Sequence, residues 1–263
     1  MAEPPIHFLL HVPKCAGTTV EAHFARHLGP AFRIAPRWEH VARNIIGNRY
    51  PKLDLAGVRA ISGHSLSVSL KAKIPGEVRE SVLLRAPLGF FLSFYNYRWT
   101  RFEEGWGPEP PAFARWYFAQ RRNPISRFLL NRYFEQGVPA LYRLSSAGRL
   151  AWLEDRLAGF HFVGGHTRAD EMIAGLSREM GMPEAARAEN VTQRKKLRAS
   201  DLPEALVARI ARENALDQAL FDRWATRGWA GRADAPMPAL RRWDQPRYLL
   251  GDSVSAIAKK AVG

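Results

Sequence analysis

The residues with the clearest chemical meaning lie near the start of the chain, in the segment HVPKCAGTT that covers residues 11–19. Gly17 lets the backbone turn close to an anion, and Lys14 supplies a cation on a mobile side chain. The backbone amides and hydroxyls of Thr18 and Thr19 add donors where a helix would begin. This pattern predicts a phosphate-binding loop. The residues expected at the phosphate groups are Pro13, Lys14, Cys15, Ala16, Gly17, Thr18 and Thr19.

The segments on either side of the loop indicate how it is held. The apolar run 6–10 predicts a buried strand, and residues 20–28 predict a helix, which gives the order strand, loop, helix. A Walker A loop places its lysine directly before Ser or Thr, whereas Lys14 precedes Ala16 and Gly17. The sequence also offers no convincing magnesium-binding aspartate after a strand. A P-loop kinase is therefore disfavoured, although phosphate binding is expected.

A second strand-to-helix segment reads VLLRAPLGFFLSFY over residues 82–95. Its apolar start predicts a buried parallel strand, Pro87 suits the first turn of a helix, and residues 90–97 continue that helix. Arg85 then lies at the carboxyl end of the strand, where open α/β sheets bind ligands. By itself, this arginine fits an anion contact and an ordinary surface residue about equally well.

Together these segments resemble the sulfotransferases that use 3′-phosphoadenosine 5′-phosphosulfate (PAPS), in the branch of the heparan sulfate 2-O-sulfotransferases and bacterial carbohydrate sulfotransferases. The first loop is similar to that family's H-x-P-K-x-x-G-T-[ST] pattern, and the second segment to L-R-D-P-x-x-R-x-x-S-x-[YF]. The second segment matches at Arg85, Pro87, Ser93 and Tyr95 and departs at Ala86 and Phe90. The resemblance implies that Arg85 and Ser93 hold the 3′-phosphate of the donor.

The same resemblance assigns catalytic roles to Lys14 and His64. His64 ends the segment AISGH, where the family carries Gly-His, and would act as the general base on the acceptor hydroxyl. A histidine suits this role because its ordinary pKa near 6.5 leaves much of it neutral. Lys14 would stabilise the charge that develops on the departing phosphate in a loose transition state. No metal is required, and no metal-binding motif is present in the sequence.

Several weaker matches concern later parts of the chain. Asn190, Arg194 and Lys195 resemble a stretch near the adenosine end of the donor, although a plain basic loop fits equally well. The segment 123–129 is placed beside the acceptor cleft. A helix over 202–227 with a break near Asn214 resembles the family's closing helix, which includes Asn214 and Asp217.

Two further residues are assigned modest roles. The cationic setting of Cys15 could lower its thiol pKa, but with no partner for nucleophilic catalysis it is expected to be a passive small side chain. His166 follows a predicted late strand, and solvent exposure is favoured over an acceptor-site role.

Composition sets the remaining bounds. The 263 residues suffice for one α/β domain over 1–230, followed by a tail over 231–263 with a short helix. One cysteine, no signal-peptide pattern and no long apolar run lead us to expect a cytoplasmic protein without a membrane span. The net charge of +14 indicates an anionic partner, and no nucleic-acid-binding signature is present in the sequence.

We therefore expect a P-loop-NTPase-like three-layer α/β fold, with a central parallel sheet flanked by helices. The expected activity is sulfuryl transfer from PAPS to a hydroxyl of an acceptor, with a carbohydrate favoured, releasing adenosine 3′,5′-bisphosphate (PAP). The alternative is a catalytically silent nucleotide- or polyanion-binding protein on the same fold, which the changes at Ala86 and Phe90 keep open.

Overall fold

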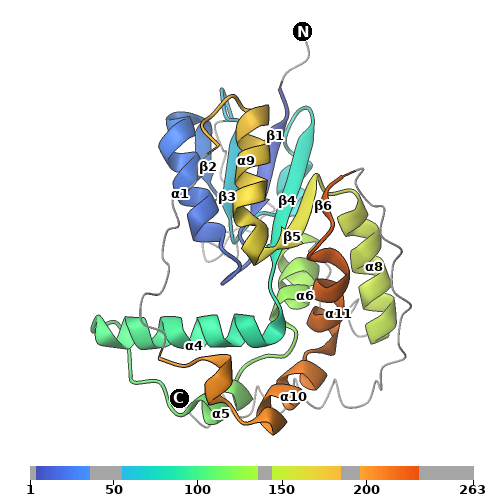
Figure 1. The fold of residues 1–263 in the computed structure, drawn as a ribbon. Coiled ribbons are helices and arrows are strands. Elements are labelled where there is room, and N and C mark those ends of the chain that lie inside the picture. The colour runs from blue at the N-terminus through green and yellow to red at the C-terminus, as the bar shows by residue number, and fades with distance from the viewer. Residues whose placement is uncertain (1–3, 36–54, 136–143, 185–195, 231–263) are drawn as a thin grey trace, which may run out of the picture.

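A six-stranded sheet forms the centre of the computed structural model, which describes residues 4–35, 55–135, 144–184 and 196–230. The strand order is β2-β3-β1-β4-β5-β6. All neighbouring pairs are parallel except β5 and β6, which pair antiparallel at one edge (Figure 1). The strands are β1 (Ile6–Leu10), β2 (Phe32–Ile34), β3 (Ala60–Gly63), β4 (Val78–Leu84), β5 (Phe162–Gly165) and β6 (Gly228–Trp229).

The sequence of the central strands explains their burial. Every residue of β1, β3 and β5 is buried, as expected for parallel strands whose two faces are both covered. Helices flank the sheet and supply that cover (Figure 1). The helices are α1 (Gly17–Leu28), α3 (Val68–Lys71), α4 (Pro87–Glu103), α5 (Phe113–Phe118), α6 (Pro124–Phe128), α8 (Ser146–Ala158), α9 (Ala169–Glu179), α10 (Glu204–Glu213) and α11 (Ala215–Trp224).

Two helices lie side by side against the sheet and are linked by a buried polar contact. In α1, Val20 and Phe24 point into the core, and in α9 Met172, Ile173 and Leu176 do the same. His23 Nε2 of α1 lies 2.9 Å from Ser177 Oγ of α9. The α4 helix follows the carboxyl end of β4 and runs across the sheet below it in the view of Figure 1.

The predicted fold class is confirmed at the level of an α/β fold with a mostly parallel central sheet between helices. The strand at 6–10 and the helix break at Asn214 are also as predicted. Two boundaries differ, because α1 already begins at Gly17 and α4 continues to Glu103. The predicted tail over 231–263 lies outside the described residues.

In the ranges that the structure describes, no helix combines the length and apolar character needed to cross a lipid bilayer.

Candidate functional site

The two neighbouring strands β1 and β4 send their connections in opposite directions. β1 leads through α1 to β2 on one side of the sheet, and β4 leads through α4 to β5 on the other. Such a divergence opens a crevice at the carboxyl ends of the strands, where open α/β folds bind ligands. The loop with Lys14 follows β1 and Arg85 follows β4, so both sequence candidates lie at this point.

The loop after β1 turns at residues that are not glycine. Lys14 and Ala16 adopt left-handed backbone angles, with φ of 63° and 66°. Ala16 is the N-cap of α1, and no side chain caps the helix there. The first amides of a helix have no intrahelical acceptor and form its positive end, so this loop presents donors suited to an anion.

Gly17 serves a purpose that the sequence does not reveal. The sequence predicts that it lets the backbone turn, but the left-handed positions are Lys14 and Ala16. A Cβ atom on Gly17 would lie 2.0 Å from Cδ2 of His11. The glycine is therefore needed because the His11 imidazole packs directly on its Cα.

Lys14 and Arg85 lie in direct contact. Arg85 Nη1 donates to the carbonyl oxygen of Lys14 over 2.8 Å. Burial lowers the pKa of both side chains, and the Arg85 charge lowers that of Lys14 further. Within the described ranges neither cation forms an ion pair with an acidic side chain, and the buried Nε of Arg85 has no hydrogen-bond partner. Two half-buried cations without a counter-charge are a natural receptor for an anion.

One face of α4 contacts both cations. Gly89, Ser93 and Tyr97 are spaced four residues apart and so share that face. A Cβ atom on Gly89 would lie 3.2 Å from Arg85 Nε, and Lys14 Nζ lies 4.1 Å from the centroid of the Tyr97 ring. Ser93 is located between these two contacts, as required if it acts with Arg85. Tyr97 is not among the residues predicted from sequence, although its spacing from Ser93 was a usable signal.

His64 follows the end of β3, which is next to β1. Gly63 before it has φ of 144°, a conformation that disfavours residues with a side chain. His64 Nδ1 lies 2.5 Å from the carbonyl oxygen of His11. A carbonyl only accepts hydrogen bonds, so Nδ1 carries the proton and Nε2 keeps its lone pair. Partial burial and the neighbouring His11 lower the pKa of His64, which favours this neutral form although the residue is solvent-exposed.

A polar chain beneath His64 fixes the position of His11. The His11 and His64 rings lie 4.2 Å apart, and His11 Nδ1 is 2.8 Å from Glu21 Oε1. Ser62 Oγ lies 2.8 Å from the same carboxylate oxygen and 2.9 Å from Leu9 O. Burial raises the pKa of Glu21, but the hydrogen bonds from His11 and Ser62 outweigh it and leave that pKa below its ordinary value. His11 is thus a positioning residue held by an ionised glutamate.

His166 joins the same edge of the sheet. Leu84 pairs with Gly165, so the residues that follow them, Arg85 and His166, leave adjacent strands. His166 is half-buried rather than exposed as expected, and its buried Nδ1 has no partner among the described residues. Burial, with a smaller contribution from the Arg85 charge, lowers the pKa of His166 to about 4. This imidazole is therefore neutral at pH 7 beside the cationic pair.

Cys15 is buried within the loop. Burial raises the pKa of its thiol, which is the opposite of the lowering that the cationic setting suggested. The thiolate that would act as a nucleophile is therefore disfavoured. The expectation of a passive small side chain fits this environment.

The segment 123–126 is hydrogen-bonded to Asn214 and Asp217, which lie about 90 residues later in the chain. Asp217 Oδ2 accepts from the amide of Ile125 at 2.8 Å, and Oδ1 accepts from the amide of Ser126 at 2.7 Å. Asn214 Oδ1 accepts from the amide of Asn123 at 2.8 Å. Asn123 has a left-handed backbone and is the N-cap of α6, so Asn214 and Asp217 cap α6 from α11 and its preceding break. These residues support the site rather than contribute reactive groups.

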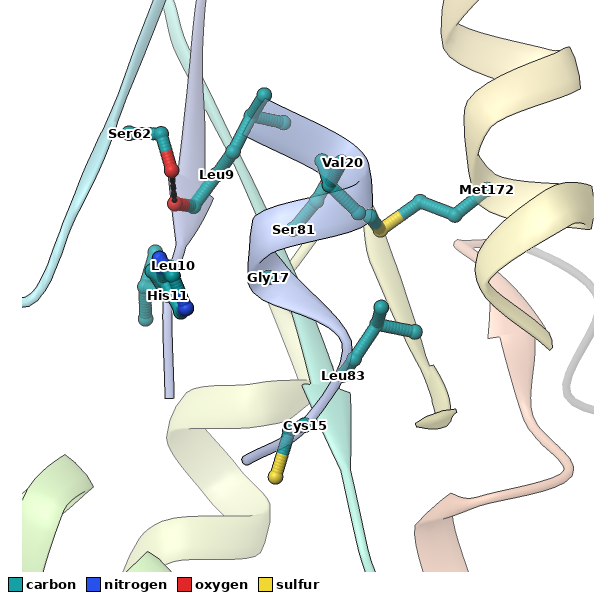
Figure 2. Close-up of a pocket in the computed structure, with 10 residues that line it drawn as sticks. All are labelled: Leu9, Leu10, His11, Cys15, Gly17, Val20, Ser62, Ser81, Leu83 and Met172. Atoms are coloured by element: carbon teal, nitrogen blue, oxygen red, sulfur yellow. Dashed lines mark hydrogen bonds between the residues drawn. The ribbon is translucent and has the colours of Figure 1, made fainter. Parts of the chain in front are cut away.

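A small pocket lies beneath the loop (Figure 2). Its lining is mostly apolar and comes from β1 and the loop after it, α1, β3, β4 and α9, with His11, Ser62 and Ser81 as polar members. Lys14 and Arg85 do not line it. We therefore regard this pocket as space within the packing under the loop, not as the place where a charged ligand binds.

Three sequence candidates, Asn190, Arg194 and Lys195, lie outside the described residues. The chain that follows them is anchored on α4, because Asn96 Nδ2 donates to Leu197 O over 2.9 Å and Asn96 Oδ1 accepts from Leu197 N over 3.0 Å. Asn96 follows Ser93 by three residues on α4.

Comparison of the chain with protein-family models, with curated proteins and with solved structures found no match.

Proposed function

We propose that the protein is a sulfotransferase that moves a sulfuryl group from PAPS to a hydroxyl of an acceptor, with a carbohydrate favoured. The observation that carries this proposal is the pair Lys14 and Arg85, two half-buried cations held together at the ends of β1 and β4 without a carboxylate among the described residues. The amides of Gly17 and Thr18, which precede the first hydrogen bonds of α1, add to the same anion-binding surface, whereas the amide of Thr19 donates to the carbonyl oxygen of Ala16.

In this proposal Arg85 and Lys14 bind different parts of the donor. Arg85, with Ser93 on the adjoining face of α4, holds the 3′-phosphate of the donor. Lys14 and the first amides of α1 face the 5′-phosphosulfate, and Lys14 stabilises the negative charge on the oxygen that departs from sulfur. The left-handed backbone at Lys14 turns its carbonyl toward Arg85, where it accepts the hydrogen bond.

His64 is the general base in this proposal. Its Nε2 accepts the proton of the acceptor hydroxyl while the acceptor oxygen forms a bond to sulfur. The bond between sulfur and the bridging phosphate oxygen breaks, and PAP leaves with the electron pair. The hydrogen bond from Nδ1 to His11 O supports this role, because it leaves Nε2 unprotonated.

A silent nucleotide-binding protein is the second candidate. Phe90, where the resembled pattern has arginine, is buried in the core and packs edge to face on Phe91. The supporting salt links of an arginine are therefore missing at this position, which favours binding without efficient turnover.

The two candidates are separated by transfer of labelled sulfuryl from PAPS to a panel of carbohydrate acceptors. The wild-type protein should form labelled product and PAP, and Lys14→Ala should reduce turnover by ~10²–10³-fold while reducing donor affinity less. Donor binding with no product from any acceptor would favour the silent candidate. Equal losses of turnover and affinity in Lys14→Ala would contradict the proposed role of Lys14 in the transition state.

A further inference from the structure

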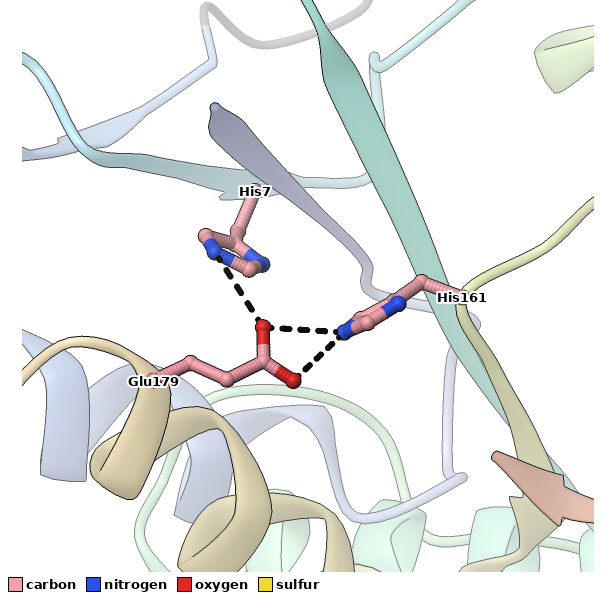
Figure 3. Close-up of side chains that lie close together, drawn as sticks. All are labelled: His7, His161 and Glu179. Carbon is pink, nitrogen blue, oxygen red and sulfur yellow. Dashed lines mark hydrogen bonds and ion pairs between the residues drawn. The ribbon is translucent and has the colours of Figure 1, made fainter. Parts of the chain in front are cut away.

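A second cluster of side chains, of the types that bind metal ions, lies at the amino ends of the strands, opposite the end that carries Lys14 and Arg85. His7 lies at the start of β1, His161 directly precedes β5, and Glu179 is the last residue of α9 (Figure 3). One ligand atom from each of them lies within 4.8 Å of the other two. These residues are at the amino ends of the strands, whereas Lys14 and Arg85 follow the carboxyl ends.

His7 is the buried member of this cluster. The residue is 2% exposed, and its buried Nδ1 has no partner among the described residues. Its Nε2 faces Glu179 but is 3.9 Å from Oε2, which is beyond hydrogen-bond distance. Because Nε2 points at the Glu179 carboxylate from beyond hydrogen-bond distance, an ion held by both side chains would fit between them.

The donor set and its spacing suit a transition metal. Two imidazoles and one carboxylate form a common three-residue zinc set, which leaves a further position for water. His161 Nε2 is 2.7 Å from Glu179 Oε1, and tetrahedral zinc separates its donors by about 3.3 Å. Side-chain shifts of roughly 1 Å would bring the three donors to that spacing. Glu179 and His161 are partly exposed, so an ion can enter from solvent.

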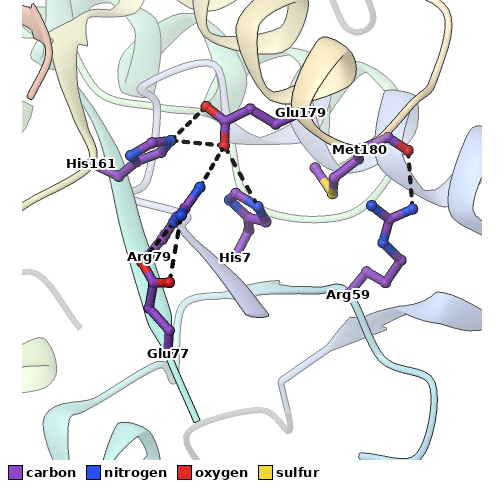
Figure 4. A network of polar contacts seen from close by, with 7 residues as sticks. All are labelled: His7, Arg59, Glu77, Arg79, His161, Glu179 and Met180. Carbon is purple, nitrogen blue, oxygen red and sulfur yellow. Dashed lines mark hydrogen bonds and ion pairs between the residues drawn. The ribbon is translucent and has the colours of Figure 1, made fainter. Parts of the chain in front are cut away.

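The surrounding contacts show which group competes with a metal. Arg79 Nη1 lies 3.2 Å from Glu179 Oε2, but Arg79 Nε also contacts Glu77 at 2.7 Å (Figure 4). Arg79 can therefore stay on Glu77 when Glu179 is taken by a metal. Arg59 Nη1 donates to Met180 O over 3.0 Å and fixes the end of α9 that carries Glu179.

We propose that His7 Nε2, His161 Nε2 and the Glu179 carboxylate bind a divalent first-row transition metal, with Zn²⁺ as the representative ion. The metal would join the starts of β1 and β5 to the end of α9. Binding to the native state would stabilise the fold, because the metal links three elements that are distant in sequence. The proposal does not depend on the sulfotransferase assignment.

Calorimetric titration of the full chain with Zn²⁺ in chelator-free buffer tests this site. We expect one ion per chain, and at a free concentration about a hundredfold above Kd we expect the melting temperature to rise by ~5–10 °C. His161→Ala should weaken the affinity at least ~10-fold, because one of three protein ligands is lost. Equal binding by the wild type and His161→Ala would overturn the proposal, as would no binding by the wild type.

Two further variants serve as controls for this titration. The His27 ring is tilted by 52° against the ring of His23, four residues earlier in α1, with 4.6 Å between the ring centroids, and this pair is the alternative zinc ligand set that the control tests. His27→Ala should bind Zn²⁺ as the wild type does, and its loss of binding would contradict the proposed site. Arg79→Ala should bind Zn²⁺ more tightly, because the cation that competes for Glu179 is gone. Unchanged or weaker binding by this variant would contradict the proposed competition at Glu179.

Discussion

Arg85 donates a hydrogen bond from Nη1 to the carbonyl oxygen of Lys14 over 2.8 Å, and this bond ties the ends of β4 and β1 together. The carbonyl that accepts it belongs to a residue with left-handed backbone, so the two cations are held by the shape of the loop. Their charges repel each other, and an anion bound between them would remove that repulsion.

Arg85→Ala should weaken the binding of PAP by ~10–100-fold, because charge-assisted hydrogen bonds to a phosphate are lost. Arg85→Lys should restore only part of the affinity, since lysine lacks the planar fork of guanidinium donors. Arg115→Ala is the matched control, because Arg115 is an exposed arginine on α5. Calorimetry measures all three, and an equal effect of Arg85→Ala and Arg115→Ala would contradict a specific site at Arg85.

His64→Gln should retain donor binding and lose turnover by ~10²–10⁴-fold, the usual contribution of a general base. In the wild type, kcat/KM should fall only as the pH drops below 6.5, because burial and His11 lower the pKa of His64. Glu21→Gln should move this midpoint to still lower pH, since the Glu21 charge raises the pKa of His64. A pH–rate profile tests both statements, and a midpoint above 6.5 would argue against His64 as the base.

Tyr97→Leu should weaken donor binding by a few-fold, because the ring that positions the Lys14 ammonium contributes about 0.5–1 kcal/mol at such a site. Tyr97→Phe keeps the aromatic face and should bind the donor nearly as the wild type does. The comparison isolates the ring, since both replacements remove the hydroxyl. If the two variants bind equally, the 4.1 Å contact between Lys14 Nζ and the ring has no role in binding.

Gly17→Ala should destabilise the fold by ~1–3 kcal/mol, because the new Cβ would overlap the His11 ring. Urea unfolding measures the loss, and Gly107→Ala is the control because no atom lies within 4 Å of the position of its Cβ. The displaced His11 should also disturb His64, so turnover should fall more than donor affinity. A stable and fully active Gly17→Ala variant would show that His11 moves aside freely.

Asp217 makes the stability of the fold depend on pH. Burial raises the pKa of this carboxyl to about 6 although three hydrogen bonds favour its ionised form. The folded state therefore holds a proton that the unfolded state has lost, and this contribution to stability decreases by at most ~3 kcal/mol as the pH rises from about 4 to 6. Asp217→Asn has no carboxyl at this position and lacks this dependence. The difference in free energy of unfolding between the wild type and Asp217→Asn, measured by urea unfolding, should therefore narrow as the pH rises over that range. A difference that widens with pH would show that the hydrogen bonds from α6 outweigh the effect of burial on the pKa of Asp217.

The sequence was most informative where local pattern and chain order act together. The apolar run before Lys14 and the apolar run before Arg85 both predicted buried parallel strands, and parallel strands bring their carboxyl ends to one edge of the sheet. That Lys14 and Arg85 lie at the same end of the sheet therefore followed from the sequence, whereas the pairing of β1 with β4, which brings them together, did not. The break at Asn214 could be located because the helical pattern loses its regularity there.

Other features depend on contacts that no local pattern encodes. Gly17 is required because the His11 ring, six residues earlier, packs on its Cα. Asp217 is required because its carboxylate accepts hydrogen bonds from the amides at the start of α6. His166 was expected to be exposed because nothing near it in the sequence shows that its strand pairs with β4. The requirement for Gly17, the requirement for Asp217 and the burial of His166 all depend on tertiary packing.

The central claim is that Lys14, Arg85 and Ser93 form a site for a nucleotide with a 3′-phosphate, and calorimetric titration with PAP tests it most directly. ADP and Mg-ATP serve as competitors that lack the 3′-phosphate. We predict that PAP binds at least ~10-fold more tightly than either, and that Arg85→Ala removes this preference. Absence of PAP binding, or a preference for Mg-ATP, would contradict the claim.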